Sequence, residues 1–336
     1  MAKAIAVKVE NNQMNTLKYL TLRFFLLGLI TSSSNTIAQQ DAWPSKQIRL
    51  VVCCAGIVDA TARILAENIS QSIKQPVIIE TKVGTSGMIA ADYVAKAKPD
   101  GYTFLVSTNS THAANQSLYN KIPYDYINDF IPVSGVSKGV MALVVNPNLP
   151  VNNVRDLTAL AKVKSGQLTF GWASSSSRVA MELYKQISDI DVTNIPYKTL
   201  PQATIDVAGG QVDMMFSDMV TAAPLVKAGK LRALAVAGKK RVPALPDVPS
   251  MEEAGVQGYE VTWWTAVWAP AGTPKDIVKK MNSLIATAIT APKTQEFFLT
   301  AGLEPFASSS EELMAFQIAE HNKWRRIIKV AGIAPE

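Results

Sequence analysis

The stretch that decides the fold is residues 48–65, IRLVVCCAGIVDATARIL. Its first part is a run of apolar, mostly β-branched residues, which predicts a buried strand. A short turn containing Gly56 follows, and apolar residues then recur at helical spacing at Ala62, Leu65 and Ile69. A strand, loop and helix start in this order leave unpaired amide groups and the positive end of a helix dipole beyond the strand. The stretch therefore predicts a site for a carboxylate or another small anion.

The same arrangement recurs along the chain. Residues 76–80 (PVIIE) and 102–107 (YTFLVS) predict further strands, and the strand predicted at 168–172 runs into the serine-rich segment 174–177 and a helix. Alternating strands and helices predict α/β domains, each a mostly parallel sheet flanked by helices. Ligands of such sheets bind beyond the carboxyl ends of the strands, where these loops lie.

A chain of 336 residues is longer than a single hydrophobic core usually supports, so two domains are expected. The segment NPNLP at 146–150 is typical of a crossing between domains, and the strand predicted at 260–268 returns across the boundary. We therefore predict one lobe from residues 39–143 and 265–336 and a second lobe from residues 144–264. Two crossings between lobes make a hinge.

Composition excludes several classes of protein. Apolar residues make up 48% of the chain and charged residues 18%, which excludes a disordered chain. The formal net charge is +6, but residues 1–38 hold four basic residues and one acidic residue, so half of that charge lies there. No block of like charge is interleaved with aromatic residues, which argues against a nucleic-acid partner.

Residues 14–38 have the layout of a secretory signal peptide. A lightly basic start precedes an apolar core, and the segment ends in small residues at Ala38. We predict a signal peptide within residues 1–38, cleavage after Ala38 and a periplasmic protein. An amphipathic first helix is the alternative, and Met14 is an alternative start.

The chain has only two cysteines, Cys53 and Cys54, which are adjacent. Neighbouring cysteines reach normal disulfide geometry only with strain, so two small buried hydrophobic side chains at a strand end are the favoured interpretation. The only histidines are His112 and His321, and both are predicted at the surface. No metal-ligand spacing is present, so neither a metal nor a cofactor is expected.

The order of motifs resembles the Bug/TctC substrate-binding proteins of tripartite tricarboxylate transporters. The similarity covers essentially all of the chain after the leader and rests on WPSKQIRLVV at 43–52, DATAR at 59–63, residues 80–87 leading to AKAKPDGYTFLV at 95–106, NIPYKTLPQATIDVAGGQVDMMFSD at 194–218, AGKLRALAVAGKKRVPALPDVPSMEEAG at 228–255 and WAPAGTP at 268–274. The resemblance implies a two-lobed, flytrap-like periplasmic binding protein of type II, a monomer and not an enzyme. It also implies capture of a small carboxylate and its delivery to a membrane permease.

The resemblance places the ligand-binding residues at the ends of strands in both lobes. They are Ala55, Gly56 and Asp59 in the first loop, Gly84, Thr85, Ser86 and Gly87 in the second, Ser107 and Asn109 after the third strand, Ser174, Ser175, Ser176 and Ser177 in the other lobe, and Asp218. The first and fourth loops are shorter than usual in the family, and the first has Gly56 alone where a Pro-rich run and a glycine pair are usual. Glycines there let the backbone approach a ligand.

Purely structural roles are the alternatives to these ligand-binding assignments. Asp59 could be only a helix N-cap, residues 174–177 could form a solvated loop, and Asp218 could be structural. Two other functions are also compatible with an exported chain. A ligand sensor for a membrane kinase would share the fold. An exported serine hydrolase needs a base, for which only His112 is a candidate, and the Gly-x-Ser-x-Gly turn is missing.

Overall fold

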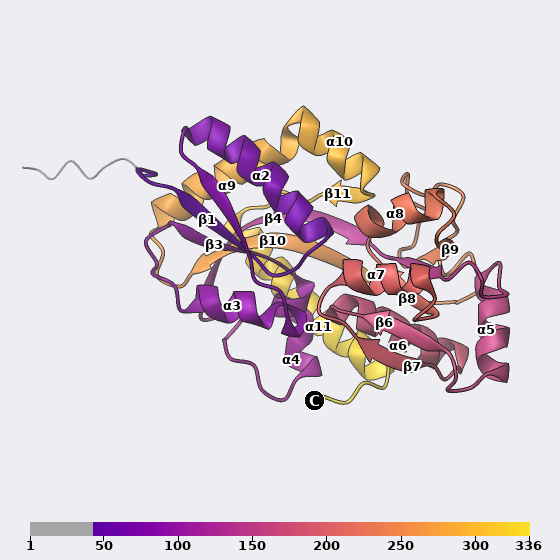
Figure 1. The fold of residues 1–336 in the computed structure, drawn as a ribbon. Coiled ribbons are helices and arrows are strands. Elements are labelled where there is room, and N and C mark those ends of the chain that lie inside the picture. Colours follow the sequence, from indigo (N-terminus) through magenta and orange to yellow (C-terminus); the bar gives the residue numbers. More distant parts are fainter. Residues whose placement is uncertain (1–42) are drawn as a thin grey trace, which may run out of the picture. The chain divides into compact units, whose positions relative to one another are not determined.

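The computed structural model describes residues 43–336, which form an α/β structure with two sheets (Figure 1). The predicted signal peptide and the cleavage after Ala38 lie outside the described residues. Among residues 43–336, no helix has the length and apolar character needed to cross a membrane.

The first sheet has six strands in the order β11-β4-β10-β3-β1-β2. Their bounds are β1 Ile48–Val52, β2 Val77–Thr81, β3 Thr103–Thr108, β4 Phe130–Val140, β10 Thr262–Pro270 and β11 Leu303–Pro305. Strand β1 pairs in parallel with β2 and β3, whereas β10 runs antiparallel to β3 and β4, and β11 antiparallel to β4. This sheet and the helices on it are called the first lobe.

Helices cover both faces of the first sheet. In Figure 1, α2, α9 and α10 lie on one side of its strands, and α3 and α4 lie on the other, where α11 packs against β4. Their bounds are α2 Ile57–Ile73, α3 Met88–Ala95, α4 Asn115–Leu118, α9 Lys275–Thr290, α10 Pro292–Thr300 and α11 Ser310–Val330. The predicted apolar stripe of α2 is buried, with Ala62, Leu65 and Ile69 at most 1% exposed.

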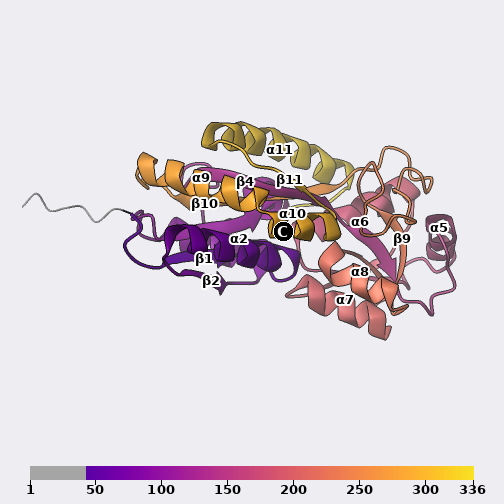
Figure 2. The same ribbon diagram turned by 90° about the horizontal axis from the view of Figure 1, so that it is seen from above.

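The second sheet has five strands in the order β7-β6-β8-β5-β9 and, with its helices, forms the second lobe. The bounds are β5 Ala142–Val145, β6 Thr169–Trp172, β7 Thr193–Pro196, β8 Met214–Ser217 and β9 Arg232–Val236, with helices α5 Val154–Val163, α6 Ser175–Ser188, α7 Leu200–Gly209 and α8 Met219–Lys227. Apolar side chains of α7 and α8, among them Val207 and Ala222, pack on Val144 and Met215 of this sheet. Figure 2 shows α5, α7, α8 and β9 gathered at one end and α2, α9 and β1 at the other.

The predicted α/β class with two lobes, each a sheet flanked by helices, is confirmed. Both sheets are mixed, however, and not mostly parallel. The parallel part of each sheet holds the strands that alternate with helices. In the first sheet β10 runs against both of its neighbours, β3 and β4, and in the second sheet β5 runs against both β8 and β9.

The chain changes sheet earlier than the expected boundaries at 143/144 and 264/265. Ala142 already pairs with Ser217 in the second sheet, and only Met141 separates β5 from the end of β4. On the return, Thr262 and Trp263 already pair with β4 in the first sheet. Apolar residues continue through both positions where the chain passes from one sheet to the other, and no turn signal interrupts them. The sequence pattern alone therefore does not mark these positions.

Strand β4 also approaches the chain that follows β11 very closely. The Gly135 amide donates to Ser308 Oγ at 2.9 Å, and the Phe306 amide donates to the Val136 carbonyl at 3.0 Å. A Cβ atom at Gly135 would lie 2.3 Å from the Phe306 carbonyl oxygen, which is backbone and cannot swing away. Glycine is therefore required at this position.

We predict that Gly135→Ala lowers the free energy of unfolding by about 1–3 kcal/mol, because the added methyl group forces strand β4 and residue 306 apart. Urea denaturation measures the change. The matched control is Gly171→Ala in β6, where the nearest atoms to a new Cβ lie at ordinary contact, 3.4 Å away. That control should change the free energy by no more than about 0.5 kcal/mol. Equal losses in the two variants would contradict the close approach.

Candidate functional site

A cavity of about 30 Å³ lies between the two lobes, at the carboxyl ends of strands from both sheets. Its volume is that of about two water molecules. The residues that line it are Cys54, Ala55, Ile57, Val58, Thr108, Asn109, Met141, Ser174, Ser176, Leu200, Asp218 and Trp263. No basic side chain is among them, so a ligand's charge must be met by amide and hydroxyl groups.

A larger groove of about 720 Å³ lies on the first lobe near Lys46 and Thr103, at the amino ends of β1 and β3. Several of its basic groups are already paired: Lys46 with Asp100 at 3.4 Å, and Lys96 with Asp92 at 2.6 Å. Because ligands of α/β sheets bind beyond the carboxyl ends of strands, the cavity between the lobes is the better candidate.

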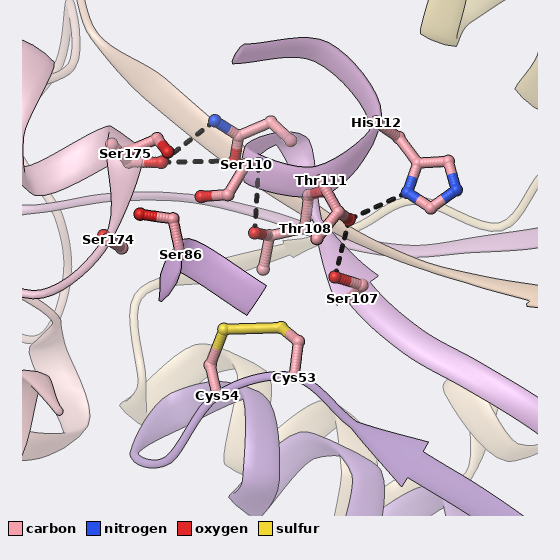
Figure 3. The surroundings of a disulfide bond; sticks show 12 residues. Cys53, Cys54, Ser86, Ser107, Thr108, Ser110, Thr111, His112, Ser174 and Ser175 are labelled. Carbon is pink, nitrogen blue, oxygen red and sulfur yellow. Dashed lines mark hydrogen bonds between the residues drawn. A yellow bond between two sulfur atoms is a disulfide. The ribbon is translucent and has the colours of Figure 1, made fainter. Parts of the chain in front are cut away.

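In the first loop, a disulfide joins Cys53 to Cys54, so the expectation of two unpaired cysteines is wrong (Figure 3). The Cys53 amide donates to the Val106 carbonyl at 3.2 Å and continues the pairing of β1 with β3. Ala55 and Cys54 line the cavity. Gly56 is the N-cap of α2, with φ at +83°.

Asp59 lies in the first turn of α2 and is not its N-cap, because Gly56 occupies that position. Its carboxylate accepts hydrogen bonds from Arg63 Nε at 2.6 Å and Thr81 Oγ1 at 2.7 Å. These partners hold the carboxylate on α2 and β2, and Asp59 does not line the cavity. A direct role for Asp59 in ligand binding stays a prediction.

The second loop, residues 84–87, packs behind the first loop and does not line the cavity. Gly84 leads into a short 3₁₀ turn in which Thr85 and Ser86 have φ of +46° and +48°. Side-chain-bearing residues rarely adopt such angles, which are concentrated at functional sites. The Ser86 hydroxyl lies 3.2 Å from the Tyr119 hydroxyl, and a Cβ atom at Gly87 would lie 3.1 Å from Cys53 Cβ.

Strand β3 ends in a π-helical turn, Ser110–Ala114, a rare conformation that often marks functional sites. Ser107, the last predicted residue on β3, is fully buried and bonds Thr111 Oγ1 at 2.7 Å. Asn109 precedes the turn and lines the cavity. Of these two predicted residues, only Asn109 therefore faces the site.

Two pairs of hydrogen-bonded residues connect the lobes beside the cavity. Asn109 Nδ2 donates to Ser176 Oγ at 2.9 Å, and Ser175 Oγ donates to Asn115 Oδ1 at 2.6 Å. All four residues are at most 2% exposed. Because buried polar groups must be paired, these contacts hold the lobes closed on one another.

The four predicted serines have two different roles at the start of α6. Ser174 is the N-cap and forms a capping box with Ser177, whose hydroxyl accepts from the Ser174 amide at 3.1 Å. Ser175 and Ser176 instead reach across to the first lobe. The segment is therefore a helix start and not a solvated loop.

Asp218 is the N-cap of α8, and it also lines the cavity. Its Oδ1 accepts from the Thr221 amide at 2.9 Å, and the residue is 1% exposed. Burial raises the pKa of this carboxyl group, an effect that the hydrogen bonds from Thr221 oppose. A Cβ atom at Gly56 would lie 3.0 Å from Asp218 Oδ2, so the two lobes also meet here. Asp218 therefore caps α8 and lines the cavity at the same time.

His112 is completely buried in the π-helical turn, so its expected surface position is wrong. The imidazole ring stacks on Trp268 with centroids 3.7 Å apart and meets the edge of Phe130 at 4.8 Å. Nδ1 lies 2.8 Å from Thr111 Oγ1, and burial lowers the pKa of the ring well below its ordinary value. The hydroxyl beside the ring belongs to Thr111, not to a serine facing the cavity, so the geometry does not favour a serine hydrolase.

Several residues of the site gave no sequence signal. Asn115 was not singled out, because its role depends on Ser175 in the other lobe. Met141, Leu200 and Trp263 also line the cavity, and apolar residues at such positions carry no signal that separates them from the core. Within residues 43–336, no group of three or more His, Cys, Asp or Glu side chains could hold a metal ion.

Residues 61–333 match the model of the TctC family, described as the tripartite tricarboxylate transporter family receptor. The chain belongs to the TctC family. This is a family of substrate-binding proteins and not of enzymes, in agreement with the resemblance seen in the motifs. Family members are periplasmic binding proteins.

Solved structures of TctC-type proteins share the fold. A Rhodopseudomonas palustris protein solved with adipate, Rpa4515, is 36% identical, covers 88% of this chain and 100% of its own, and superposes with a TM-score of 0.85. The periplasmic binding protein BugD is 30% identical over the same shares of the two chains, with a TM-score of 0.83. MatC of R. palustris, solved with bound malate, is 28% identical and covers 85% of this chain and 100% of its own, with a TM-score of 0.81.

We predict that burial of His112 makes the free energy of unfolding decrease as the pH falls below the ordinary pKa of histidine. The folded protein keeps the ring neutral, whereas the unfolded chain binds a proton as the pH drops below about 6.5, so acid favours unfolding. Between pH 6.5 and 5, the free energy of unfolding should fall more steeply than in His112→Gln, by up to about 1.4 kcal/mol per pH unit. Urea denaturation across this range measures both slopes, and all other titrating groups are common to the two proteins. Parallel curves would contradict the neutral buried ring.

Proposed function

We propose that this chain is an exported solute-binding protein that encloses a small carboxylate between its lobes and delivers it to a membrane permease. Three observations support this proposal. The chain is a TctC-family protein, relatives of the same fold were solved with adipate and with malate, and the cavity lies where ligands of α/β sheets bind. Export through a signal peptide cut after Ala38 is part of the same proposal.

The observation that carries the proposal is the pair of helix starts at the cavity. Ser174 and Asp218, the N-caps of α6 and α8, both line it, so the amide groups of two first helical turns lie next to the cavity. Hydroxyl groups of Ser176 and Thr108 and the amide of Asn109 add further donors. Donors of this kind bind a carboxylate without a basic side chain.

The closed arrangement implies an opening step. A cavity with room for about two water molecules is smaller than a dicarboxylate, so the lobes must separate before such a ligand enters. Separation breaks the Asn109–Ser176 and Asn115–Ser175 hydrogen bonds, and closure on the ligand forms the Asn115–Ser175 bond again. The residues that cross between the sheets, around Met141 and before Thr262, are where we place the hinge.

The proposal predicts stabilisation by a small carboxylate. At 100 times its dissociation constant, a ligand bound only by the folded protein adds about 2.7 kcal/mol to the free energy of unfolding. A thermal-shift screen of mono-, di- and tricarboxylates should therefore show a rise of several degrees in Tm for at least one compound. The matched control is the neutral amide of each acid, with every carboxylate converted, which should give no shift. A screen in which no carboxylate raises Tm would contradict the proposed function.

We also predict that Ser175→Ala weakens ligand binding, although Ser175 does not line the cavity. The substitution removes the 2.6 Å bond to Asn115 and so destabilises the closed form. The loss of one hydrogen bond, about 0.5–1.5 kcal/mol, corresponds to a roughly 2- to 13-fold higher Kd, measured by titration calorimetry. The control is Ser72→Ala on the exposed side of α2, which should bind as the parent does. Unchanged affinity in Ser175→Ala would show that this contact does not contribute to closure.

A further inference from the structure

One of the two cysteines of this chain, Cys54, lies at the wall of the cavity and is bonded to the other, Cys53. Cys54 lines the cavity, and Cys53 is 1% exposed behind it. Figure 3 shows the bridged sulfur atoms on the first loop, facing the side of Ser86 and Thr108. The disulfide therefore occupies a position where backbone donors could otherwise meet a ligand.

Cys53 has no room to move. Its amide is bonded to Val106, and the second loop packs against its side chain so closely that a Cβ atom at Gly87 would lie 3.1 Å from Cys53 Cβ and 3.6 Å from its sulfur. Cys54 is only partly buried and faces the cavity. Any rearrangement of the pair must therefore move the Cys54 sulfur.

The cavity has an apolar part and a polar part. Cystine sulfur is a poor hydrogen-bond partner, and Ile57, Val58 and Met141 extend the apolar lining beside Cys54. The polar lining residues are Thr108, Asn109, the helix-start serines Ser174 and Ser176, and Asp218. A ligand held by its carboxylate at the polar part places the rest of its body against sulfur and hydrocarbon.

We propose that the Cys53–Cys54 disulfide is a specificity-determining wall of the ligand site, which favours carboxylates with an apolar body and binds them well only in its oxidised form. The inference rests on the proposed function. Hydroxyl groups on the ligand body would lose water against this wall and find no partner, and that loss weakens binding.

Reduction changes the wall by a balanced exchange. A dithiol reductant gives two electrons and two protons, the sulfur–sulfur bond of the protein breaks to two thiols, and the reductant becomes a cyclic disulfide. Two unbonded sulfur atoms need more room than a bonded pair. Because Cys53 is fixed, the Cys54 thiol moves into the cavity and takes space from the ligand. An exported protein keeps the oxidised form, since disulfides persist in oxidising compartments.

The test compares adipate with galactarate, which has the same chain length and charge but carries a hydroxyl group on every carbon between its carboxylates. Titration calorimetry of the oxidised full-length protein should give a Kd for adipate about tenfold or more below that for galactarate. Reduction with dithiothreitol, verified by a mass gain of two hydrogens, should raise the adipate Kd about fivefold or more, and reoxidation should restore it. The double variant C53S/C54S should show no response to the reductant.

Each outcome decides the inference. Equal adipate affinity of oxidised and reduced protein, or a reductant effect of the same size in C53S/C54S, would overturn it, and so would tighter binding of galactarate. If the double variant does not fold, the adipate Kd of the oxidised, reduced and reoxidised wild-type protein decides the inference by itself. If neither diacid binds but another carboxylate raises Tm in the broader screen, this inference fails and the proposed function stands. If no carboxylate raises Tm, the proposed function fails as well.

Discussion

The site depends on hydrogen bonds that the two lobes make to each other at the start of α6. Asn109 and Asn115, on either side of the π-helical turn, bond to Ser176 and Ser175, and all four side chains are buried. A buried polar group without a partner costs about 1–3 kcal/mol, so these groups cannot be left unpaired when the lobes part or when a ligand enters. Closure is thus an exchange of partners among the lobes, water and ligand.

Asn109 is held in place from behind by β10, which packs on α11. The amide of Trp264 approaches Asn109 Oδ1 at 3.4 Å, and the indole groups of Trp264 and Trp268 donate to Glu320 and Gln317 of α11. Trp268 in turn stacks on His112 inside the π-helical turn. A helix at the end of the sequence therefore fixes the turn that precedes α4, and the rigid first lobe presents its donors at a constant position.

Local patterns predicted the elements well, and contacts between distant residues explain the differences. The strand, loop and helix after Ile48 are as expected, because neighbouring residues determine them. Of the predicted site residues, Ala55, Asn109, Ser174, Ser176 and Asp218 line the cavity. Burial of His112, the exchange of sheets at Met141 and the partner of Ser175 depend on the other lobe or on β10, and no pattern near them carries that information.

Gly56 shows how the lobes constrain each other's sequence. The resemblance attributes loop glycines to the approach of a ligand, but the atom nearest to a Cβ at Gly56 belongs to Asp218 of the second lobe, at 3.0 Å. Asp218 must stay there because it caps α8 through Thr221. Gly56 therefore lets the first loop close onto the cap of α8. It is the glycine of this loop that closure of the two lobes requires. The cysteine pair occupies the start of the same loop, where the pairing of Cys53 with Val106 continues the sheet.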